Sequence, residues 1–598
     1  MLKGNVKILG SNCLSCRDLI GPLVLFMFWV TATMVVNAQL VPRPQLRIAI
    51  LGNPDINVKW NDEELEALKK IGFNAIQLNI AWGGRPFGEA LNLEDVVTAP
   101  GEIEKPRVAA MRSDLKARAA MAKRHGFLTI FQFGSPYVNW DPYTGKVRRA
   151  CQGCPDDTTF DSWYDIRNPL VVQHARVLLE EFRRDFPDVD DIEVYTYDQN
   201  AWQTPEFQEG TYSFGIPLSD RLPEYLKSLY LVWTNGRHHT HRMWWEPWEL
   251  SAGQVYTILP HLPRTNFGLM IHGDIAEAQL ALPVDLWFRN TVRICQKLGI
   301  PVVAEAFWTS HTEEIQPLSI PAPRLVDEQY LRMMQVPGIM GIKEYYGIIP
   351  DAPDPNLDVL RLRLNGFKDT TNALLTRIAS RYVPAEHNVQ KYFNLLSDAY
   401  QMYPWDATWL AREIGHSTPD HGWAGATIRG EVANTPDWRA TRNAIFMMTT
   451  NVQPSFWMLE DVQLRCQVTA KDLKDALSLG KEIIGKVSDP KQKEYFEAVQ
   501  RNAEYWRRIT LSYAFHLRET NIAELLRIDI RAGKPLDQNL LGEMKDLLDA
   551  DVRNQDSTGK VVEMRRLFEE NPKAFVDRYL VPTEATPIKK GYFAFTTR

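Results

Sequence analysis

The sequence predicts an α/β protein with a (β/α)₈ TIM barrel followed by an α-helical C-terminal domain. Between residues 46 and 347, eight short β-rich runs alternate with helical segments. Several of these runs are apolar throughout, which is typical of parallel strands that are covered on both faces. An open doubly wound sheet is the alternative, but the chain contains neither G-x-G-x-x-G nor G-x-x-x-x-G-K-[ST], the phosphate-binding loops such sheets usually carry.

The predicted strands are short runs rich in Val, Ile, Phe and Tyr, and turn residues bound most of them. They are 46–52, 73–82, 127–133, 191–198, 241–247, 266–273, 300–308 and 338–347. The segments between them carry the three-to-four-residue spacing of apolar side chains expected of helices. They are 62–72, 107–126, 169–186, 221–233, 251–262, 284–299 and 323–335. The regular alternation of the two patterns is what predicts a closed barrel.

A change of pattern after residue 350 predicts a second domain. The Pro- and Asp-rich stretch DAPDPNLD (351–358) reads as a linker, and the following segments are mostly helical, including the long stretch 491–531. We therefore expect a catalytic barrel domain over 39–350 and an α-helical domain over 351–534. Residues 535–598 are expected to form a helical C-terminal extension.

Residues 1–38 resemble a secretory signal peptide. Lys3, Lys7 and Arg17 precede an apolar run over 19–36, and small residues lead to Ala38. We predict cleavage after Ala38, export to the periplasm or the medium, and no stable membrane insertion afterwards. The alternative is an uncleaved signal anchor, since the run approaches the lower length limit for a membrane span.

Charge and cysteine spacing narrow the classes of partner. A net charge of −6 without a basic stripe argues against nucleic acid. Cys151 and Cys154 form a C-x-x-C without a second such pair, so a local disulfide is a better interpretation than zinc. The HHTH run at 238–241 precedes the fifth strand, at the wrong end of a barrel for a metal site. We expect no metal and no cofactor, and the oligomeric state is left open.

Polar and aromatic residues gather where the predicted strands end, and barrel enzymes build their active sites at these C-terminal ends. They are Trp82, Gln132, Asp198, Asn200, Trp245, Glu246, Trp248, His272, Glu305, Trp308, Glu344 and Tyr345. The stretch WWEPWE (244–249) is the densest example, with three indoles around two carboxylates. The set includes carboxylates from the fourth, fifth, seventh and eighth strands.

Paired carboxylates beside aromatic rings point to one chemistry. A carboxyl flanked by indoles loses water, so its pKa rises and it holds a proton for a leaving group. A second carboxylate in a wetter setting stays ionised as base or nucleophile, and aromatic rings bind the apolar faces of sugars. We therefore predict a glycoside hydrolase with Asp198, Glu246 and Glu305 as catalytic residues and the other rim residues as substrate-binding. Whether the enzyme retains or inverts stereochemistry depends on the carboxyl separation.

Each of these residues also has a structural interpretation. Carboxylates at strand ends cap helices or form ion pairs, and a single histidine is often a core residue. Lys343 points to the opposite strand face from Glu344 and so cannot pair with it through adjacency. Trp244 and Trp245 also face opposite ways, so only one of them can line the rim.

An exported barrel with acids on the fourth and seventh strands resembles the large retaining glycoside hydrolase clan, which places its acid/base and its nucleophile on those strands. The resemblance covers about 300 residues and concerns architecture. It implies a carbohydrate substrate and roles for Asp198 and Glu305. The clan carries Asn-Glu at the end of the fourth strand, whereas this chain has Tyr197 and Asp198.

Two other functions use the same rim. One is a non-catalytic carbohydrate-binding barrel, in which the aromatic residues serve as a platform for sugars. The other is a polysaccharide lyase with a Tyr or His base. No G-x-S-x-G elbow indicates a serine hydrolase, and the identity of the sugar and its linkage stay open.

Overall fold

The computed structural model describes residues 43–53, 56–80, 89–134, 169–196, 218–235, 241–247, 250, 252–272, 280, 284, 286–311, 319–384, 387–405, 456–555 and 560–578. The predicted signal segment and the C-x-x-C at 151–154 lie outside these residues. So do most of the HHTH run and the site candidates Trp82, Asp198, Asn200 and Trp248.

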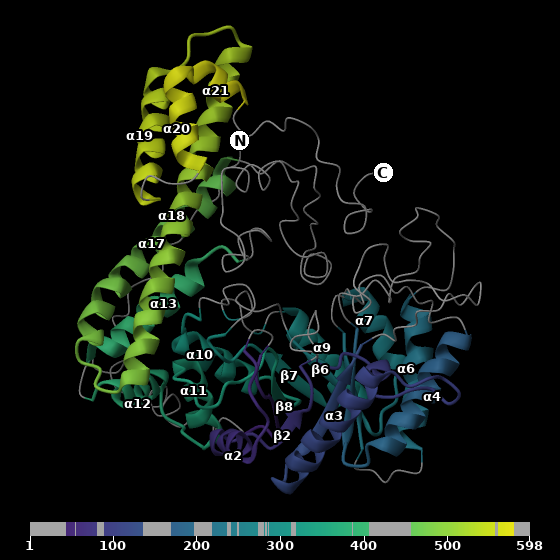
Figure 1. The fold of residues 1–598 in the computed structure, drawn as a ribbon. Helices are drawn as coiled ribbons and strands as arrows, with labels where there is room; N and C mark the ends of the chain where they lie inside the picture. Colours follow the sequence, from purple (N-terminus) through teal and green to yellow (C-terminus); the bar gives the residue numbers. More distant parts are fainter. Residues whose placement is uncertain are drawn as a thin grey trace, which may run out of the picture. The chain divides into compact units, whose positions relative to one another are not determined.

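Eight parallel strands form a closed barrel in sequence order (Figure 1). They are β1 (Leu46–Ile50), β2 (Ala75–Gln77), β3 (Leu128–Phe133), β4 (Asp191–Tyr195), β5 (Met243–Glu246), β6 (Phe267–Ile271), β7 (Val302–Ala306) and β8 (Ile339–Glu344). Strand β8 closes the barrel by pairing with β1, with Leu46 opposite Gly341 and Ile48 opposite Lys343. The predicted (β/α)₈ barrel is thus confirmed, and the open doubly wound sheet is wrong.

Helices connect the strands, and local sequence fixes where they begin and end. They are α2 (Asp62–Ile71), α3 (Pro106–Arg124), α4 (Pro169–Asp185), α6 (Leu218–Thr234), α7 (Ala252–Ile258), α9 (Leu286–Leu298) and α10 (Pro323–Met334), with the 3₁₀ turns η2 (Leu93–Asp95) and η4 (Leu259–His261). In α2, the Asn61 side chain caps the N-terminus by accepting a hydrogen bond from Glu64 N at 2.9 Å. Gly72 ends the same helix at a φ of 121°, a conformation that side chains with a Cβ rarely adopt.

Alternate residues of each strand point into the barrel, and the first inward layer is apolar except for the buried Asp191, which lies opposite Ile130. The apolar residues of this layer are Leu46, Ile48, Ala75, Ile130, Trp244, Met270 and Val303. Residues two positions further along a strand share the same face, so they lie directly above this floor. On five strands these next residues are polar and buried: Gln77, Gln132, Glu246, His272 and Glu305. The apolar floor therefore supports a polar layer at the C-terminal ends of the strands.

Trp244 is the largest side chain of the floor. Its indole Nε1 donates a hydrogen bond to Asp191 Oδ2 at 2.9 Å. Burial raises the pKa of Asp191 to about 7. The ring also fills the space beside Gly268 on β6, where an added Cβ would lie only 2.2 Å from Trp244 Cζ3. Gly268 thus makes room for the indole inside the barrel.

The C-terminal region is helical throughout its described part, as predicted (Figure 1). Its helices are α11 (Pro355–Leu364), α12 (Thr371–Tyr382), α13 (His387–Met402), α17 (Phe456–Ile484), α18 (Pro490–Arg531), α19 (Gln538–Asn554), α20 (Lys560–Glu570) and α21 (Pro572–Arg578). A buried ion pair joins this region to the barrel helices: Arg363 of α11 binds Asp327 of α10 through two hydrogen bonds of 2.6 and 2.8 Å. The predicted boundaries at residues 350 and 534 stay predictions.

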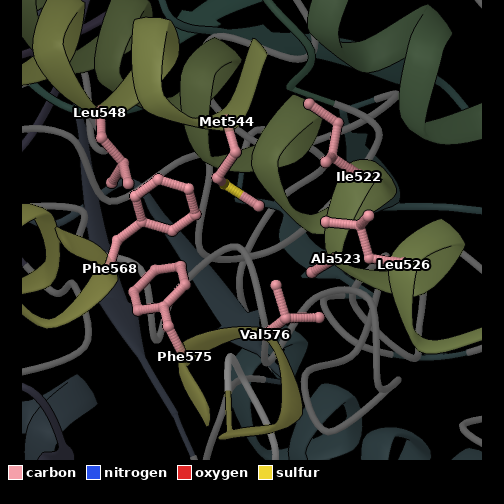
Figure 2. Close-up of a cluster of buried hydrophobic side chains, with 8 residues drawn as sticks. All are labelled: Ile522, Ala523, Leu526, Met544, Leu548, Phe568, Phe575 and Val576. Carbon is pink, nitrogen blue, oxygen red and sulfur yellow. The ribbon is translucent and has the colours of Figure 1, made fainter. Parts of the chain in front are cut away.

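The last helices pack on the C-terminal half of α18 around a separate apolar cluster (Figure 2). The cluster consists of Ile522, Ala523, Leu526, Met544, Leu548, Phe568, Phe575 and Val576. Phe568 of α20 and Phe575 of α21 meet edge to face, with ring centroids 5.4 Å apart. The described part of 535–598 is therefore a packed helical unit.

Cys295 and Cys466 are buried free thiols. Among the described residues, no helix has the length and apolar character needed to cross a lipid bilayer.

The contact between Gly268 and Trp244 generates a stability prediction. We expect Gly268→Ala to lower the free energy of unfolding by about 1–3 kcal/mol, because the new methyl group overpacks the barrel floor. Chemical denaturation of the full chain measures this loss. Gly542→Ala is the matched control, since nothing lies within 4 Å of its added Cβ on α19 and helical alanine is favourable. Equal stability of Gly268→Ala and the wild type would contradict the packing described.

Candidate active site

Four charged side chains meet in the polar layer above the barrel floor. The Lys343 Nζ atom lies 2.5 Å from Glu193 Oε1, 2.9 Å from Glu305 Oε1 and 3.8 Å from Glu246 Oε2. None of the four side chains is more than 1% exposed. They come from β4, β5, β7 and β8, and Glu305 lies directly opposite Lys343 in the β7–β8 pair. The barrel therefore encloses three carboxylates around one ammonium.

The surroundings move the pKa values of these carboxyls in different directions. Burial, and then the charge of Glu305, raises the pKa of Glu246 well above its ordinary value. Burial also acts to raise the pKa of Glu305, but the Lys343 ammonium and His272 outweigh it and lower that pKa. Burial raises the pKa of Glu193 despite its contact with Lys343. Two neighbouring carboxyls thus favour opposite protonation states.

Two glutamine amides orient Glu246. Gln77 Nε2 donates to Gln132 Oε1 at 2.8 Å, which turns the Gln132 amide so that its Nε2 donates to Glu246 Oε2 at 3.1 Å. Gln77 Nε2 is itself fixed by the Asn79 carbonyl at 2.7 Å. The amide chain across β2 and β3 therefore distinguishes the two oxygens of the Glu246 carboxyl.

His272, at the end of β6, lies between Glu246, whose pKa is raised, and Glu305, whose pKa is lowered. Its Nδ1 is 3.5 Å from Glu305 Oε2 and 3.9 Å from Glu246 Oε1. One atom from each of these three side chains lies within 4.8 Å of the other two, so the trio could hold a metal ion. The Lys343 ammonium already supplies a countercharge at Glu305 Oε1, which disfavours a cation there.

Aromatic side chains lie one layer above the carboxylates. The Tyr195 and Tyr345 hydroxyls form a hydrogen bond across the barrel between β4 and the end of β8. The Tyr345 ring lies 5.6 Å from the His272 ring and 4.9 Å from Phe307, measured between centroids. Tyr345 thus borders the polar layer.

The structure gathers several of the residues predicted from the sequence into one site. These are Gln132, Glu246, His272, Glu305 and Tyr345, from strands β3 and β5 to β8. Trp82, Asp198, Asn200 and Trp248 lie outside the described residues, so their assigned roles stay predictions.

The structure corrects the expectation that Trp245, Trp308 and Glu344 line the rim. Trp245 is fully buried on the opposite face of β5 from Glu246. Trp308 is fully buried as well, and its Nε1 donates to the Lys343 carbonyl at 3.1 Å. Its ring meets Tyr330 of α10 edge to face. These indoles are packing residues.

Glu344 is also structural. Its Oε2 accepts a hydrogen bond from Trp308 N at 2.8 Å, and its Oε1 accepts from Tyr346 N at 3.0 Å and Gly347 N at 3.2 Å. Burial raises its pKa to about 8, even though the three amide donors act in the opposite direction. The side chain organises the backbone after β7 and β8 and does not join the carboxylates around Lys343.

Sequence reasoning missed Glu193, Lys343 and Gln77. These residues lie within the predicted strands and not at their ends, two positions beyond inward-facing Asp191, Gly341 and Ala75. A charged residue within an otherwise apolar strand, in phase with an inward position, is the signal that could have identified them.

Comparisons with known proteins show the fold. No family model and no curated protein matches the sequence. Among solved structures, a GH138 enzyme targeting pectin rhamnogalacturonan II is similar at 10% identity and a TM-score of 0.52, over 86% of this chain and 62% of that one. This chain therefore spans less than two thirds of that protein.

Two further structures are similar at lower TM-scores. A Thermobaculum terrenum O-GlcNAc hydrolase mutant is 10% identical over 86% of this chain and 97% of its own, with a TM-score of 0.37. A Bacteroidetes-affiliated GH5 cellulase linked with a polysaccharide utilization locus is 12% identical over 55% and 95%, also at 0.37. The architectural resemblance to (β/α)₈ glycoside hydrolases is confirmed by the GH138 structure, and no specific family is assigned.

The contacts of Glu344 generate a prediction that separates a structural role from a chemical one. We expect Glu344→Gln to destabilise the protein by about 1–3 kcal/mol, because an amide cannot accept all three backbone hydrogen bonds. Thermal and chemical unfolding measure the change. Glu63→Gln, at an exposed position of α2, is the control and should stay within about 0.5 kcal/mol of wild type. Unchanged stability in Glu344→Gln would contradict this role.

Proposed function

We propose that this protein is an exported glycoside hydrolase in which Glu246 is the general acid and Glu305 the nucleophile. The observation that carries the proposal is the pair of adjacent buried carboxyls whose pKa values move in opposite directions. A protonated carboxyl beside an ionised one is the requirement of glycosidic bond cleavage. The N-terminal signal pattern supports export, and the barrel shared with a GH138 enzyme supports a polysaccharide or oligosaccharide substrate.

The contacts of Glu246 indicate which oxygen carries the proton. Gln132 donates a hydrogen bond to Oε2, and the Lys343 ammonium is also nearest to Oε2. An oxygen that accepts an amide hydrogen bond and lies nearest the ammonium is a poor place for a proton, so we assign the proton to Oε1. Glu193 also interacts with the protonated Glu246 carboxyl and raises its pKa further. Oε1 is the oxygen that faces His272, on the side of the site shared with Glu305. The acid therefore presents its proton toward the nucleophile's side of the site.

The spacing of the two carboxyls favours retention of stereochemistry. An oxygen of Glu246 and one of Glu305 lie within 4.8 Å of each other. Retaining enzymes hold their carboxyls about 5–5.5 Å apart, whereas inverting enzymes need about 6.5–9.5 Å to admit a water.

The reaction then follows two displacements. Glu305 attacks the anomeric carbon while the glycosidic C–O bond breaks, and Glu246 Oε1 gives its proton to the leaving oxygen. Glu246, now ionised, takes a proton from water, and the resulting hydroxide attacks the anomeric carbon. The bond to Glu305 breaks, which releases the sugar and restores both carboxyls.

Asp198 keeps the catalytic role predicted from the sequence as a hypothesis. The resemblance to the retaining clan implies an acid/base on the fourth strand, and Asp198 follows β4 outside the described residues. The geometry within the barrel instead supports Glu246, on the fifth strand, as the general acid. Separate variants of the two residues decide between them.

Substitution of the two carboxyls tests the proposal directly. We expect Glu305→Gln to abolish sugar release from a polysaccharide and oligosaccharide panel, and Glu246→Gln to lower it by about 10²–10⁴-fold. An aryl glycoside with an acidic leaving group needs no protonation, so it should restore turnover in Glu246→Gln and not in Glu305→Gln.

Asp198→Asn is the matched comparison for that experiment, and circular dichroism verifies folding of each variant. Full loss in Asp198→Asn with rescue by the activated substrate would transfer the acid role to Asp198. Sugar release that survives in Glu305→Gln would refute the assignment of the nucleophile. A folded wild type that binds sugars without turnover would favour the carbohydrate-binding alternative, and an unsaturated product would favour the lyase.

The pKa directions predict the pH profile of kcat/KM. Glu305 must be ionised, and its pKa is lowered, so the acidic limb should lie below the ordinary glutamate value of about 4.3. Glu246 must be protonated, and its pKa is raised, so the basic limb should lie well above that value. Initial rates across pH should therefore give a broad plateau, and a narrow maximum close to the ordinary glutamate pKa would contradict these roles.

A further inference from the structure

We propose that Lys343 is a positioning residue that decides which of the three buried carboxyls holds a proton, with Glu193 as the anchor that fixes its ammonium. This inference rests on the proposed function for its catalytic consequence. Its structural basis is independent of that function, because it concerns the resting charge distribution of the barrel interior.

The distances from Lys343 rank the carboxylates. Glu193 at 2.5 Å and Glu305 at 2.9 Å form direct ion pairs, whereas Glu246 at 3.8 Å stands further away. Coulomb attraction falls with distance, so the ammonium stabilises the charges of Glu193 and Glu305 more than that of Glu246. Glu246 is therefore the carboxyl left to carry a proton.

Charge balance leads to the same result. Three ionised carboxylates and one ammonium would leave two uncompensated negative charges in a layer without solvent exposure. A buried charge without a partner is strongly unfavourable, so at least one carboxyl binds a proton. Protonation of the most distant carboxyl loses the least attraction to Lys343.

Groups on neighbouring elements complete the environment of the ammonium. His272 of β6 faces Glu246 and Glu305, and the Tyr345 ring lies 6.0 Å from Lys343 Nζ. Tyr195 of β4 reaches Tyr345 through its hydroxyl. Among the described residues of this layer, Lys343 is the side chain that carries a permanent positive charge, so its removal has no substitute.

Glu193 is needed because the Lys343 side chain is long and flexible. Its carboxylate holds the ammonium from β4, across the barrel from β8, while Glu305 holds it from the neighbouring strand β7. With both contacts in place, the Nζ atom is fixed on the side of Glu246 Oε2. The free oxygen Oε1 is thereby left for the proton.

The arrangement also defines what Lys343 does not do. An amine that attacks a carbonyl must be neutral, and pairing with two carboxylates keeps this one charged. Lys343 accordingly acts through Glu305 and Glu246 and does not react with substrate itself.

Infrared difference spectroscopy of the full-length protein tests the inference without any substrate. Protonated carboxyls give C=O stretching bands apart from those of carboxylates. Buried Glu344 and Asp191, whose pKa values are raised to about 8 and about 7, also contribute such bands at neutral pH. We therefore expect the spectrum of wild type minus that of Glu246→Gln to contain one further band, from Glu246. Lys343→Met removes the ion-pair partner of both Glu193 and Glu305, so an additional protonated carboxyl should appear. Adding Glu193→Gln and Glu305→Gln together should remove it. Lys343→Arg keeps the charge and should restore the wild-type number of bands.

Two variants keep the test decisive if Lys343→Met fails to fold. The double variant Glu193→Gln/Lys343→Met removes one negative and one positive charge. Glu305 should become protonated in this double variant, because its ammonium partner is gone. Glu193→Gln alone releases the anchor and should leave Glu305 ionised through its own pair with Lys343. Spectra of the folded Lys343 variants that show no additional protonated carboxyl would overturn the inference.

Kinetics separate this inference from the proposed function. In Lys343→Met the acidic limb of kcat/KM should move up by at least about one pH unit, since Glu305 becomes harder to ionise. A purely structural role would lower rates at all pH values without moving that limb. If the infrared bands behave as expected while wild type releases no sugar, the proposed function fails and the role of Lys343 stands.

Discussion

The buried contact of Lys343 with three carboxylates is the constraint on which the rest of the site depends. An isolated ion in the barrel interior would be several kcal/mol unfavourable even after relaxation, so each charge requires a partner of opposite sign at short range. The barrel supplies these partners from strands far apart in sequence, because Glu193 and Lys343 are 150 positions apart. The closed sheet is thus required to bring these four side chains together.

Layering explains how the barrel holds so much charge without losing its core. Below the carboxylates lies an apolar floor with Trp244 at its centre, and above them lie Tyr195, Phe307 and Tyr345. Because strand side chains alternate with period two, a single position shift would exchange Glu246 with Trp245 and bring an indole into the site. The WWE order therefore places one tryptophan below the carboxylate, one outside the barrel and the glutamate inside.

The sequence allowed the barrel and its eight strands to be predicted because alternation and apolar runs are local properties. It identified Glu246 and Glu305 for the same reason, since both stand at the ends of recognisable strands. It did not identify Glu193 or Lys343, because their importance depends on distances across the barrel. The position of Glu344 at a strand end led to a wrong prediction that it lines the site. It follows Lys343 in the chain, yet it binds backbone amides on the other side of the strand.

Tryptophans next to carboxylates in the sequence were a poor indicator of which aromatic residues line the site. An indole next to a carboxylate in the chain was expected to exclude water from that carboxylate. In the structure, Trp245 and Trp308 are buried in packing positions, and much of the dehydration of Glu246 comes from its place inside the barrel.

Glu246 and Glu305 are the same residue type at the same depth, so burial alone cannot give them different protonation states. The difference must come from their neighbours: Gln77 and Gln132 fix one oxygen of Glu246, and Lys343 lies closer to Glu305. The two carboxyls are therefore distinguished by the arrangement of four strands around them.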